Sequence, residues 1–549
     1  MKHIGLLVSL IIVASLLMAC STATPETVVV KETIVVEGTV QVEEKIVTAT
    51  PEPMAPEKKM LVYVHPQEVR WLDPAQMTES QSGTLARNIY SRLLDQSYDA
   101  AEIMPDLAEE WGISEDGLVY TFHLREGVKF HDGTPLTVDD VVYSFKRALA
   151  INQGSTVHVH DLLDPDNVVA LNDTTVQMTL NEAWSPFLNI VASPNAFSIL
   201  PQEWMEAHKT EDDPWATEYL QNHANGTGPF KFVEWKPKEY VQLERYEDYY
   251  KGAAKIEVIF YQLGADDTAT RLAFEKEDVD IVQHLPDDMM RVLSKNPNVT
   301  VINKPLASFM YWIFDCEKEP FTDKRVRQAF VYAIDYEAMM ENLVKEGGVR
   351  MNSPLLKGML GYNEDIPLIE RDVEKAKQLL ADAGYADGLT IDMPYVEWGL
   401  IPDLAVVIQS NLADIGVTAK LQEIPLNALM AGIEEGGFSF FVWNSSPSYP
   451  HPDGLFIKLI SSGFEKSLEG NLAHYSNPEV DAAVEKARNA TTQADQIAAY
   501  EKSQELVMED MPWMLLYQES QYRAVGSWVT GYDFGGFNYV NFWDLDIKK

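Results

Sequence analysis

The sequence of 549 residues predicts an α/β fold, on the basis of two periodic patterns and the length of the chain. Segments in which apolar and polar residues alternate predict strands, whereas apolar residues three or four positions apart predict helices. In one stretch, strands at 391–394, 418–422 and 438–443 alternate with a helix around 404–414, as in an α/β domain. Residues 59–549 are also long enough to enclose two or three hydrophobic cores.

Residues 105–149 form a block that reads as strand, turn, strand, turn and helix. Val119–Leu124 alternates as a strand, and Glu126-Gly127 and Asp132-Gly133 mark turns. Thr137 is a suitable cap for the helix that follows, whose first turn carries two aspartates. The apolar face of this helix consists of Val138, Val141, Val142, Phe145 and Leu149.

The other expected elements follow in chain order. They are a strand at 61–65, a helix at 84–94, a strand at 174–180, a short apolar element at 184–190, a glycine turn with two strands at 226–250, and helices after Asp323, at 372–384 and from Asn477-Pro478. The glycines of Gly226-Thr227-Gly228 predict a turn rather than a phosphate site. Pro229 has no N–H to donate, and no Lys-Ser/Thr pair follows.

The N-terminus predicts a lipoprotein signal peptide over residues 1–20. Two basic residues precede an apolar run at 4–18, which suits the core of a signal peptide and is too short for a permanent membrane span. The run ends in Leu17-Met18-Ala19-Cys20, which resembles a bacterial lipobox with Cys20 as the lipidated residue. The alternative is an ordinary secretory signal with an incidental cysteine. If Cys20 is lipidated, Cys316 has no partner for an intramolecular disulfide.

Residues 21–58 predict a flexible tether between the membrane and the folded body, because they are rich in Thr, Pro, Val and Glu. As a coil, they would span roughly 35 Å. Their valine alternation also allows a hairpin that turns at Gly38. The sequence has no further run of eighteen apolar residues, so we expect nothing else to cross the membrane.

The formal net charge of −41 argues against nucleic-acid binding, because such a field repels polyanions. Common hydrolase, zinc and dinucleotide motifs (HExxH, CxxC, GxSxG, GxGxxG) are absent, and we expect neither catalytic residues nor a cofactor. His158 and His160 would share one face of an extended segment and are the best candidates for metal binding. Solvated loops give such pairs more often, so we expect no metal site.

Four segments together resemble one protein family: Trp71–Pro74, the block at 105–149, Gly226–Tyr250 and Pro320–Gly347. In this order they are similar to the family 5 extracytoplasmic solute-binding proteins, the peptide receptors of ABC importers. The resemblance implies a two-lobed periplasmic-binding-protein clamshell of the class II type with an additional domain. It implies the following limits: domain I at 59–104, 225–311 and 525–549, domain II at 105–224, and domain III at 312–524.

The resemblance also implies a solute site. Trp443 matches a family tryptophan, but Asn444-Ser445-Ser446 stands where the family's aspartate for the peptide amine is expected, and Asp453 comes later. No Lys or Arg lies between Lys420 and Lys458. The candidates are therefore aromatic and mostly neutral, and suit a peptide backbone or a sugar ring. They are Trp398, Trp443, Asn444, Ser445, Ser446, Tyr449 and Asp453, with Thr78, Glu79 and Ser80 from domain I.

These features predict a monomeric, lipid-anchored extracytoplasmic receptor without enzymatic activity. It would bind a peptide-like solute between its lobes and deliver it to an ABC permease. Three alternatives remain open at this point: an oligosaccharide receptor of the same family, an extracytoplasmic hydrolase, and a sensor that presents its ligand to a receptor kinase.

Overall fold

The computed structural model describes residues 27–36, 39–48, 58–97, 102–264, 266–462 and 470–549, in two compact units, 1–58 and 59–549. In the first unit, β1 (Thr27–Val36) and β2 (Thr39–Thr48) form an antiparallel ladder in which Val36 pairs with Thr39. The valine alternation therefore forms a hairpin. Its predicted turn at Gly38, the signal peptide at 1–20 and Cys20 lie outside the described residues, and the tether remains a prediction.

A nine-stranded sheet runs through the second unit. Its strand order is β10-β11-β12-β3-β13-β19-β14-β18, with β15 paired to β19. The strands are β3 (Met60–His65), β10 (Phe230–Lys236), β11 (Tyr240–Arg245), β12 (Val258–Leu263), β13 (Ile281–Val282), β14 (Val299–Phe314), β15 (Gly348–Arg350), β18 (Phe440–Ser445) and β19 (Trp513–Gly526). Within the described residues of this sheet, the parallel pairings are those of β3 with β12 and with β13.

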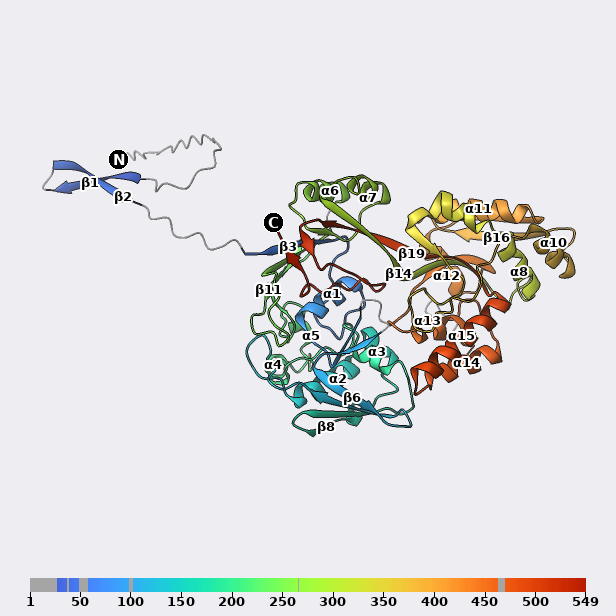
Figure 1. Ribbon diagram of the computed structural model, residues 1–549, viewed down its shortest axis with the longest axis horizontal. Helices are drawn as coiled ribbons and strands as arrows, with labels where there is room; N and C mark the ends of the chain where they lie inside the picture. Colours follow the sequence, from blue (N-terminus) through green and yellow to red (C-terminus); the bar gives the residue numbers. More distant parts are fainter. Residues whose placement is uncertain (1–26, 37–38, 49–57, 98–101, 265, 463–469) are drawn as a thin grey trace, which may run out of the picture. The chain divides into compact units, whose positions relative to one another are not determined.

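Strands β14 and β19 are the long pair that joins the two lobes of this unit (Figure 1). One end of the pair packs in the cores around Leu61 and Val64, and the other end in the core that runs from Ala307 to Tyr517. We call residues 59–304 and 520–549 the first lobe and residues 305–519 the second lobe. The two-lobed α/β prediction is confirmed. The domain limits predicted at 311–312 and 524–525 fall inside these continuous strands and remain a prediction.

The first lobe also contains a separate four-stranded sheet, whose strand order is β6-β7-β9-β8. Its further strands are β4 (Leu94–Gln96), β5 (Ile103–Pro105), β6 (Ala108–Ile113), β7 (Val119–Leu124), β8 (Val168–Asn172), β9 (Thr175–Thr179), β20 (Val529–Thr530) and β21 (Asp546–Ile547). Its helices are α1 (Ser80–Ile89), α2 (Val138–Ile151), α3 (Phe187–Val191), α4 (Gln202–His208), α5 (Thr217–Leu220), α6 (Asp267–Glu275) and α7 (Asp287–Leu293), with 3₁₀ turns η1 (Gly154–His158) and η2 (Pro165–Asn167).

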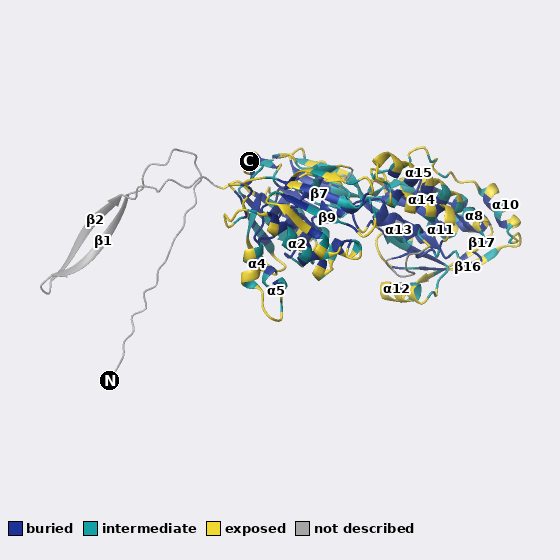
Figure 2. Cartoon of the chain, turned by 90° about the horizontal axis from the view of Figure 1, so that it is seen from below, coloured by how far each residue is buried: buried dark blue, intermediate teal, exposed yellow. Residues whose placement is uncertain are grey.

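Helix α2 begins where its sequence predicted. Thr137 accepts from the Asp140 N–H, and the Asp140 carboxylate accepts from the Thr137 N–H at 2.8 Å, which completes a capping box. Val138, Val141, Phe145 and Leu149 are buried beneath the helix and Val142 is half-buried. Figure 2 shows exposed residues on the outer side of α2 and buried ones beneath it.

The second lobe packs helices around the parallel pair β16 (Leu389–Tyr395) and β17 (Val417–Glu423) and the end of the central sheet. The helical segments are α8 (Lys324–Ala333), α9 (Tyr336–Met339), the π turn η3 (Met340–Val344), the 3₁₀ turn η4 (Lys345–Gly347), α10 (Val373–Asp382), α11 (Ile401–Ala413), α12 (Leu426–Glu434), α13 (Asp453–Ile460), α14 (Pro478–Arg488) and α15 (Gln493–Asp510). Asp323, Asp372 and Asn477 each accept a backbone N–H at the start of α8, α10 and α14.

One predicted helix is misplaced. The helix expected at 84–94 is α1, which begins at Ser80 and ends at Ile89, while Leu94 lies in strand β4. The Gly228 N–H donates to the Ile89 carbonyl at 2.9 Å, so the glycine turn packs against the end of the helix. Among the residues that the structure describes, no helix combines the length and apolar character needed to cross a bilayer.

Candidate functional site

A cavity of about 750 Å³, which we call the cleft, lies between the two lobes. The first lobe contributes residues around Met77–Ser80, the turn η1, residues 193–195 and the C-terminal segment 536–539. The second lobe contributes 306–308, 446–450 and Lys458. A solute bound here would touch both lobes at once.

A bulge in β14 shapes one wall of the cleft. The pairing of β14 with β19 is interrupted between Pro305 and Phe309, so residues 306–308 leave the ladder and line the cleft. The Ala307 N–H donates to the Gly536 carbonyl at 2.9 Å, which holds the C-terminal segment against this wall.

The polar side chains of the cleft are almost all neutral. Hydroxyl and amide groups are supplied by Thr78, Ser80, Ser155, Ser193, Asn195, Ser308, Ser446, Ser448, Asn538 and Tyr539. Of the described residues that line the cleft, Lys458 is the only one with a charged side chain, and none is Asp or Glu. This composition suits the carbonyl, amide and hydroxyl groups of a polar solute.

His158 lies in the cleft as a neutral imidazole. Its ring centroid is 4.9 Å from that of Tyr449. Burial, followed by the positive charge of Lys458, lowers the pKa of His158 to about 4.

His160 does not join His158, because the segment forms a 3₁₀ turn instead of the extended strand predicted for it. The His160 ring is exposed and lies 3.1 Å from Asp161. No group of three or more His, Cys, Asp or Glu within the described ranges could hold a metal ion.

Tyr449 links the cleft to the interior. It reaches from the second lobe into a core otherwise built from first-lobe residues, where Trp184 packs edge-on against it at 5.7 Å. The Tyr449 hydroxyl donates to Asp453 Oδ2 at 2.6 Å, and Trp184 Nε1 donates to the same oxygen at 3.3 Å. Arg488 Nε lies 3.1 Å from Asp453 Oδ1. Asp453 is fully buried and does not line the cleft.

The predicted tryptophans lie elsewhere. Trp443 is half-buried on β18 against the core of the second lobe, and Trp398 is 56% exposed in the loop before α11. Neither lines the cleft.

Asn444 stands behind the wall of the cleft, where its amide donates to Ser308 Oγ at 3.0 Å and to Glu519 Oε2 at 3.2 Å. Ser445 is buried beside it on β18, and only Ser446 of the three predicted polar residues reaches the cleft.

Glu79 does not line the cleft, but its hydrogen bonds fix the loop that does. Its carboxylate accepts from the Arg70 N–H (3.2 Å), the Ser82 hydroxyl (2.6 Å), and the N–H and hydroxyl of Thr78 (3.2 and 3.1 Å). These bonds hold Thr78 and Ser80 at the cleft.

Several cleft residues were not predicted from the sequence: Asn195, Lys458, Phe537 and Tyr539. His158 was considered only for metal binding and not as part of the cleft wall. These residues come from segments far apart in the chain, and only Lys458 left a usable signal. It lies on the same helix as Asp453, so a helical projection of 453–460 would have shown that the two charges face different ways.

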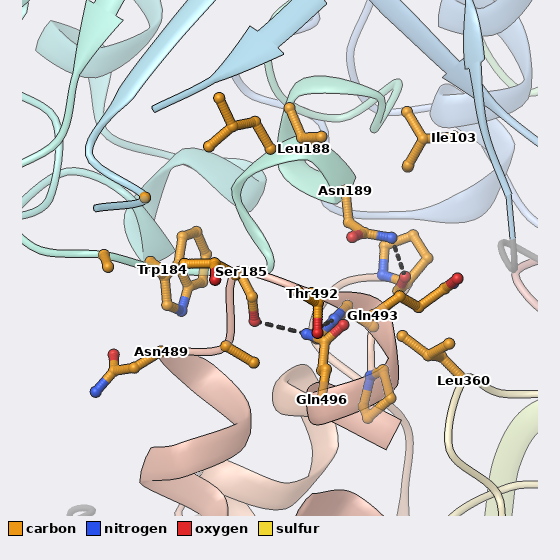
Figure 3. A pocket seen from close by; sticks show the side chains of 18 of the residues that line it. Ile103, Trp184, Ser185, Leu188, Asn189, Leu360, Asn489, Thr492, Gln493 and Gln496 are labelled. Carbon is orange, nitrogen blue, oxygen red and sulfur yellow. Dashed lines mark hydrogen bonds between the residues drawn. The ribbon is translucent and has the colours of Figure 1, made fainter. Parts of the chain in front are cut away.

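A second cavity, of about 460 Å³, lies beside the cleft where α3 of the first lobe approaches α14 and α15 (Figure 3). Ser185 donates its N–H to the Arg488 carbonyl at 2.8 Å and its hydroxyl to the Ala487 carbonyl at 3.0 Å. The Gln496 amide donates to Ser185 Oγ at 2.6 Å, and the Asn189 amide to the Pro450 carbonyl at 3.0 Å. We call these contacts, with that between Trp184 and Asp453, the interlobe latch.

Comparison with known proteins gives a consistent result. The family model of bacterial extracellular solute-binding proteins, family 5 middle, matches residues 102–466, well over half of the chain. Heme-binding protein A of Haemophilus influenzae is 28% identical over 91% of this chain and 94% of its own. The probable D,D-dipeptide-binding periplasmic protein DdpA of Escherichia coli is 27% identical over 89% and 95%. The structure of HbpA2 from Haemophilus parasuis superposes with a TM-score of 0.81 at 27% identity, covering 89% of this chain and 100% of that one.

Proposed function

Since the chain belongs to the bacterial extracellular solute-binding proteins of family 5, we propose that it captures a peptide-like solute and delivers it to the membrane permease of an ABC importer. The observation that carries this proposal is the cleft, whose walls come from both lobes. A solute that contacts both walls stabilises the closed arrangement relative to the open one, and a permease can recognise that difference.

Peptide-like chemistry is supported by the cleft's hydroxyl and amide groups, which can pair with peptide N–H and carbonyl groups. One of the relatives is named for binding a dipeptide. An oligosaccharide would need open aromatic faces for its rings. Tyr449 is covered by His158 and Trp184, and neither Trp398 nor Trp443 lines the cleft, so none of the three aromatic residues predicted from the sequence offers an open face to a sugar. Phe537 and Tyr539 are the other aromatic residues of the cleft, and the preference for a peptide therefore rests on the hydroxyl and amide groups.

The relatives reported above are named as binding proteins. We infer that this chain also acts by binding alone, as a monomer, and without a cofactor. An assay of the purified protein against peptide and glycoside substrates would test this point, and turnover of either substrate would contradict it.

Closure is tested by small-angle scattering with and without solute. Native mass spectrometry of the purified protein identifies the co-purifying solute, and one molecule per chain is expected. Saturation with that solute should reduce the radius of gyration, because closure brings the lobes together. An unchanged radius at saturation would contradict the clamshell mechanism.

We also propose that Cys20 carries the lipid that anchors the protein outside the cytoplasm. The Cys20→Ser variant should then be released from membranes, while Cys316→Ser should remain bound. Cys316 is a suitable control because its thiol is half-buried in the second lobe, where burial raises its pKa to about 11. Unchanged membrane association of Cys20→Ser would contradict the anchor.

A further inference from the structure

The second cavity is lined by apolar side chains from both lobes. Ile103 and Leu188 belong to the first lobe, and Met359 and Leu360 belong to the second. Figure 3 shows Ile103 and Leu188 on one side of the cavity and Leu360 on the other. All four are half-buried, so each leaves apolar surface in contact with water. A ligand that covered this surface would gain free energy from the hydrophobic effect.

The less exposed polar side chains of the second cavity are already paired within the protein. Gln496 bonds to Ser185, and the Asn189 amide donates to a carbonyl of the second lobe. The amide nitrogen of Gln496 also lies 3.0 Å from His451 Nε2, and His451 Nδ1 accepts a backbone N–H at 3.1 Å. The other polar residues of the lining are all exposed, and they are Glu102, Asn489, Thr491, Thr492 and Gln493. The sheltered part of the cavity therefore offers a ligand mainly apolar side chains.

The second cavity adjoins the cleft, because Pro450 and Phe537 line both. Pro450 ends the segment 446–450 of the cleft wall, and Phe537 lies in the C-terminal segment that is bonded to Ala307. A solute in the cleft can therefore place one of its side chains in the second cavity. The volume of about 460 Å³ is sufficient for a large side chain.

We propose that the second cavity selects the solute by binding one large apolar side chain, such as that of Phe or Leu, of a peptide whose backbone lies in the cleft. The inference rests on the proposed function, since it names the class of peptide that the same receptor binds. Hydroxyl and amide groups of the cleft can pair with any peptide backbone, so selectivity among peptides has to come from a site for a side chain.

The same side chain would favour closure of the lobes. Its two walls belong to different lobes, so it touches Leu188 and Leu360 together only while the lobes are together. The apolar contact would then act alongside the hydrogen bonds of the interlobe latch. A peptide with the matching side chain would therefore stabilise the closed arrangement more than a peptide without it.

The test is calorimetry on the intact protein with tetra-alanine and with four peptides in which one alanine is replaced by phenylalanine. At one position the replacement should strengthen binding about ten- to a hundredfold, as expected for the burial of a large apolar side chain. Lysine at that position should give no such gain, because its charge would be buried next to polar groups that are already paired.

Two variants assign the effect to the second cavity, and each has a matched control. Ala490 lines the second cavity but not the cleft, so Ala490→Trp should fill the cavity and remove the phenylalanine gain, while tetra-alanine binds as before. Ala482→Trp, at an exposed position of α14, should keep the full gain. Leu360→Ala removes apolar wall without filling the cavity and should reduce the gain about three- to tenfold. Leu368→Ala, at an exposed position outside the cavity, should not reduce it.

Equal binding of tetra-alanine and all four phenylalanine peptides, or an equal gain at every position, would overturn the inference and leave the proposed function in place. A gain that persists in Ala490→Trp would also overturn it. Stronger binding of the lysine peptide would do the same and would point to Glu102, the one carboxylate among the described residues that line the second cavity. Failure of all these peptides to bind would contradict the proposed function itself.

Discussion

At the scale of single residues, burial decides what a carboxylate does. Asp453 and Glu79 are both acidic residues near a candidate loop, and either could supply an anchor for a solute amine. In the structure, Asp453 joins the second lobe to Trp184 of the first, and Glu79 folds its own loop. Both carboxylates therefore contribute to the shape of the cleft through other residues.

Asp453→Asn tests this structural role. The change leaves Arg488 without its ion-pair partner, so we expect a loss of about 2–4 kcal/mol in the free energy of unfolding, measured in urea. Asp403→Asn, at an exposed position of α11, should change it by less than about 0.5 kcal/mol. Addition of Arg488→Met should recover part of the loss. If the Asp453→Asn protein were instead as stable as the unmodified protein but no longer bound peptides with a free amino terminus, Asp453 would be the residue that binds the solute amine.

At the scale of elements, two contacts position the cleft walls. The glycine turn at 226–228 packs on the last carbonyls of α1, the helix that follows the Thr78 loop. In the interlobe latch, Ser185, just before α3, is bonded to the last turn of α14 and to the first turn of α15.

Gly226→Ala tests the first contact. A Cβ at this position would overlap the Ile89 carbonyl oxygen and approach the Tyr90 ring, so backbone would have to move. We expect a loss of about 1–3 kcal/mol in unfolding free energy. Gly112→Ala is the control, because a Cβ there meets no atom within 4 Å. Equal stability of the two variants would show that the turn does not pack tightly on α1.

The double variant Ser185→Ala/Asn189→Ala tests the latch. It removes side-chain hydrogen bonds that exist only while the lobes are together, each worth about 0.5–1.5 kcal/mol. The solute-free protein should show a larger radius of gyration in scattering, and solute affinity should fall about fivefold to a hundredfold.

Ser294→Ala is the control for the latch, because this exposed hydroxyl bonds only within the end of α7. It should leave both the radius of gyration and the affinity unchanged. An unchanged radius and affinity in the double variant would show that the latch does not influence closure.

At the scale of the whole molecule, buried histidines make stability depend on pH. His65 and His451 are 2% and 3% exposed, and burial lowers the pKa of each from 6.5 to about 3. His451 Nδ1 accepts from the Asp453 N–H at 3.1 Å, a bond that a protonated ring would lose. Below pH 6.5 the unfolded chain binds protons that the folded chain does not.

The contribution of these histidines is therefore complete above pH 6.5 and is lost as the pH falls towards 3. At pH 5 each group should have lost about 2 kcal/mol. Urea unfolding at pH 7 and at pH 5 should show this decrease in the free energy of unfolding. In His451→Gln, the decrease between the two pH values should be smaller by about 2 kcal/mol. The exposed His160→Gln should behave as the unmodified protein. A His451→Gln protein with the full pH dependence would contradict the assignment.

The sequence by itself determined the elements whose cause is local. Thr137 and Asp140 cap α2, and Asp323 caps α8, because a cap needs only residues three or four positions apart. Strand β7 follows from alternation along six residues. The order of such segments was also enough to indicate the family and the two-lobed fold.

Only the tertiary structure decided which side chains meet in the cleft. The β14 bulge, the insertion of Tyr449 into the core of the opposite lobe, and the partners of Asp453 all depend on strand pairing and burial between distant segments. Trp398 and Trp443 were attractive as sequence candidates, yet one is exposed outside the cleft and the other packs on a core. Lys458 is a cleft residue because the side of α13 that carries Asp453 packs into the interior, which leaves Lys458 on the side that faces the cleft. A one-dimensional pattern records spacing, whereas a binding site is made by the packing of residues that are distant in sequence.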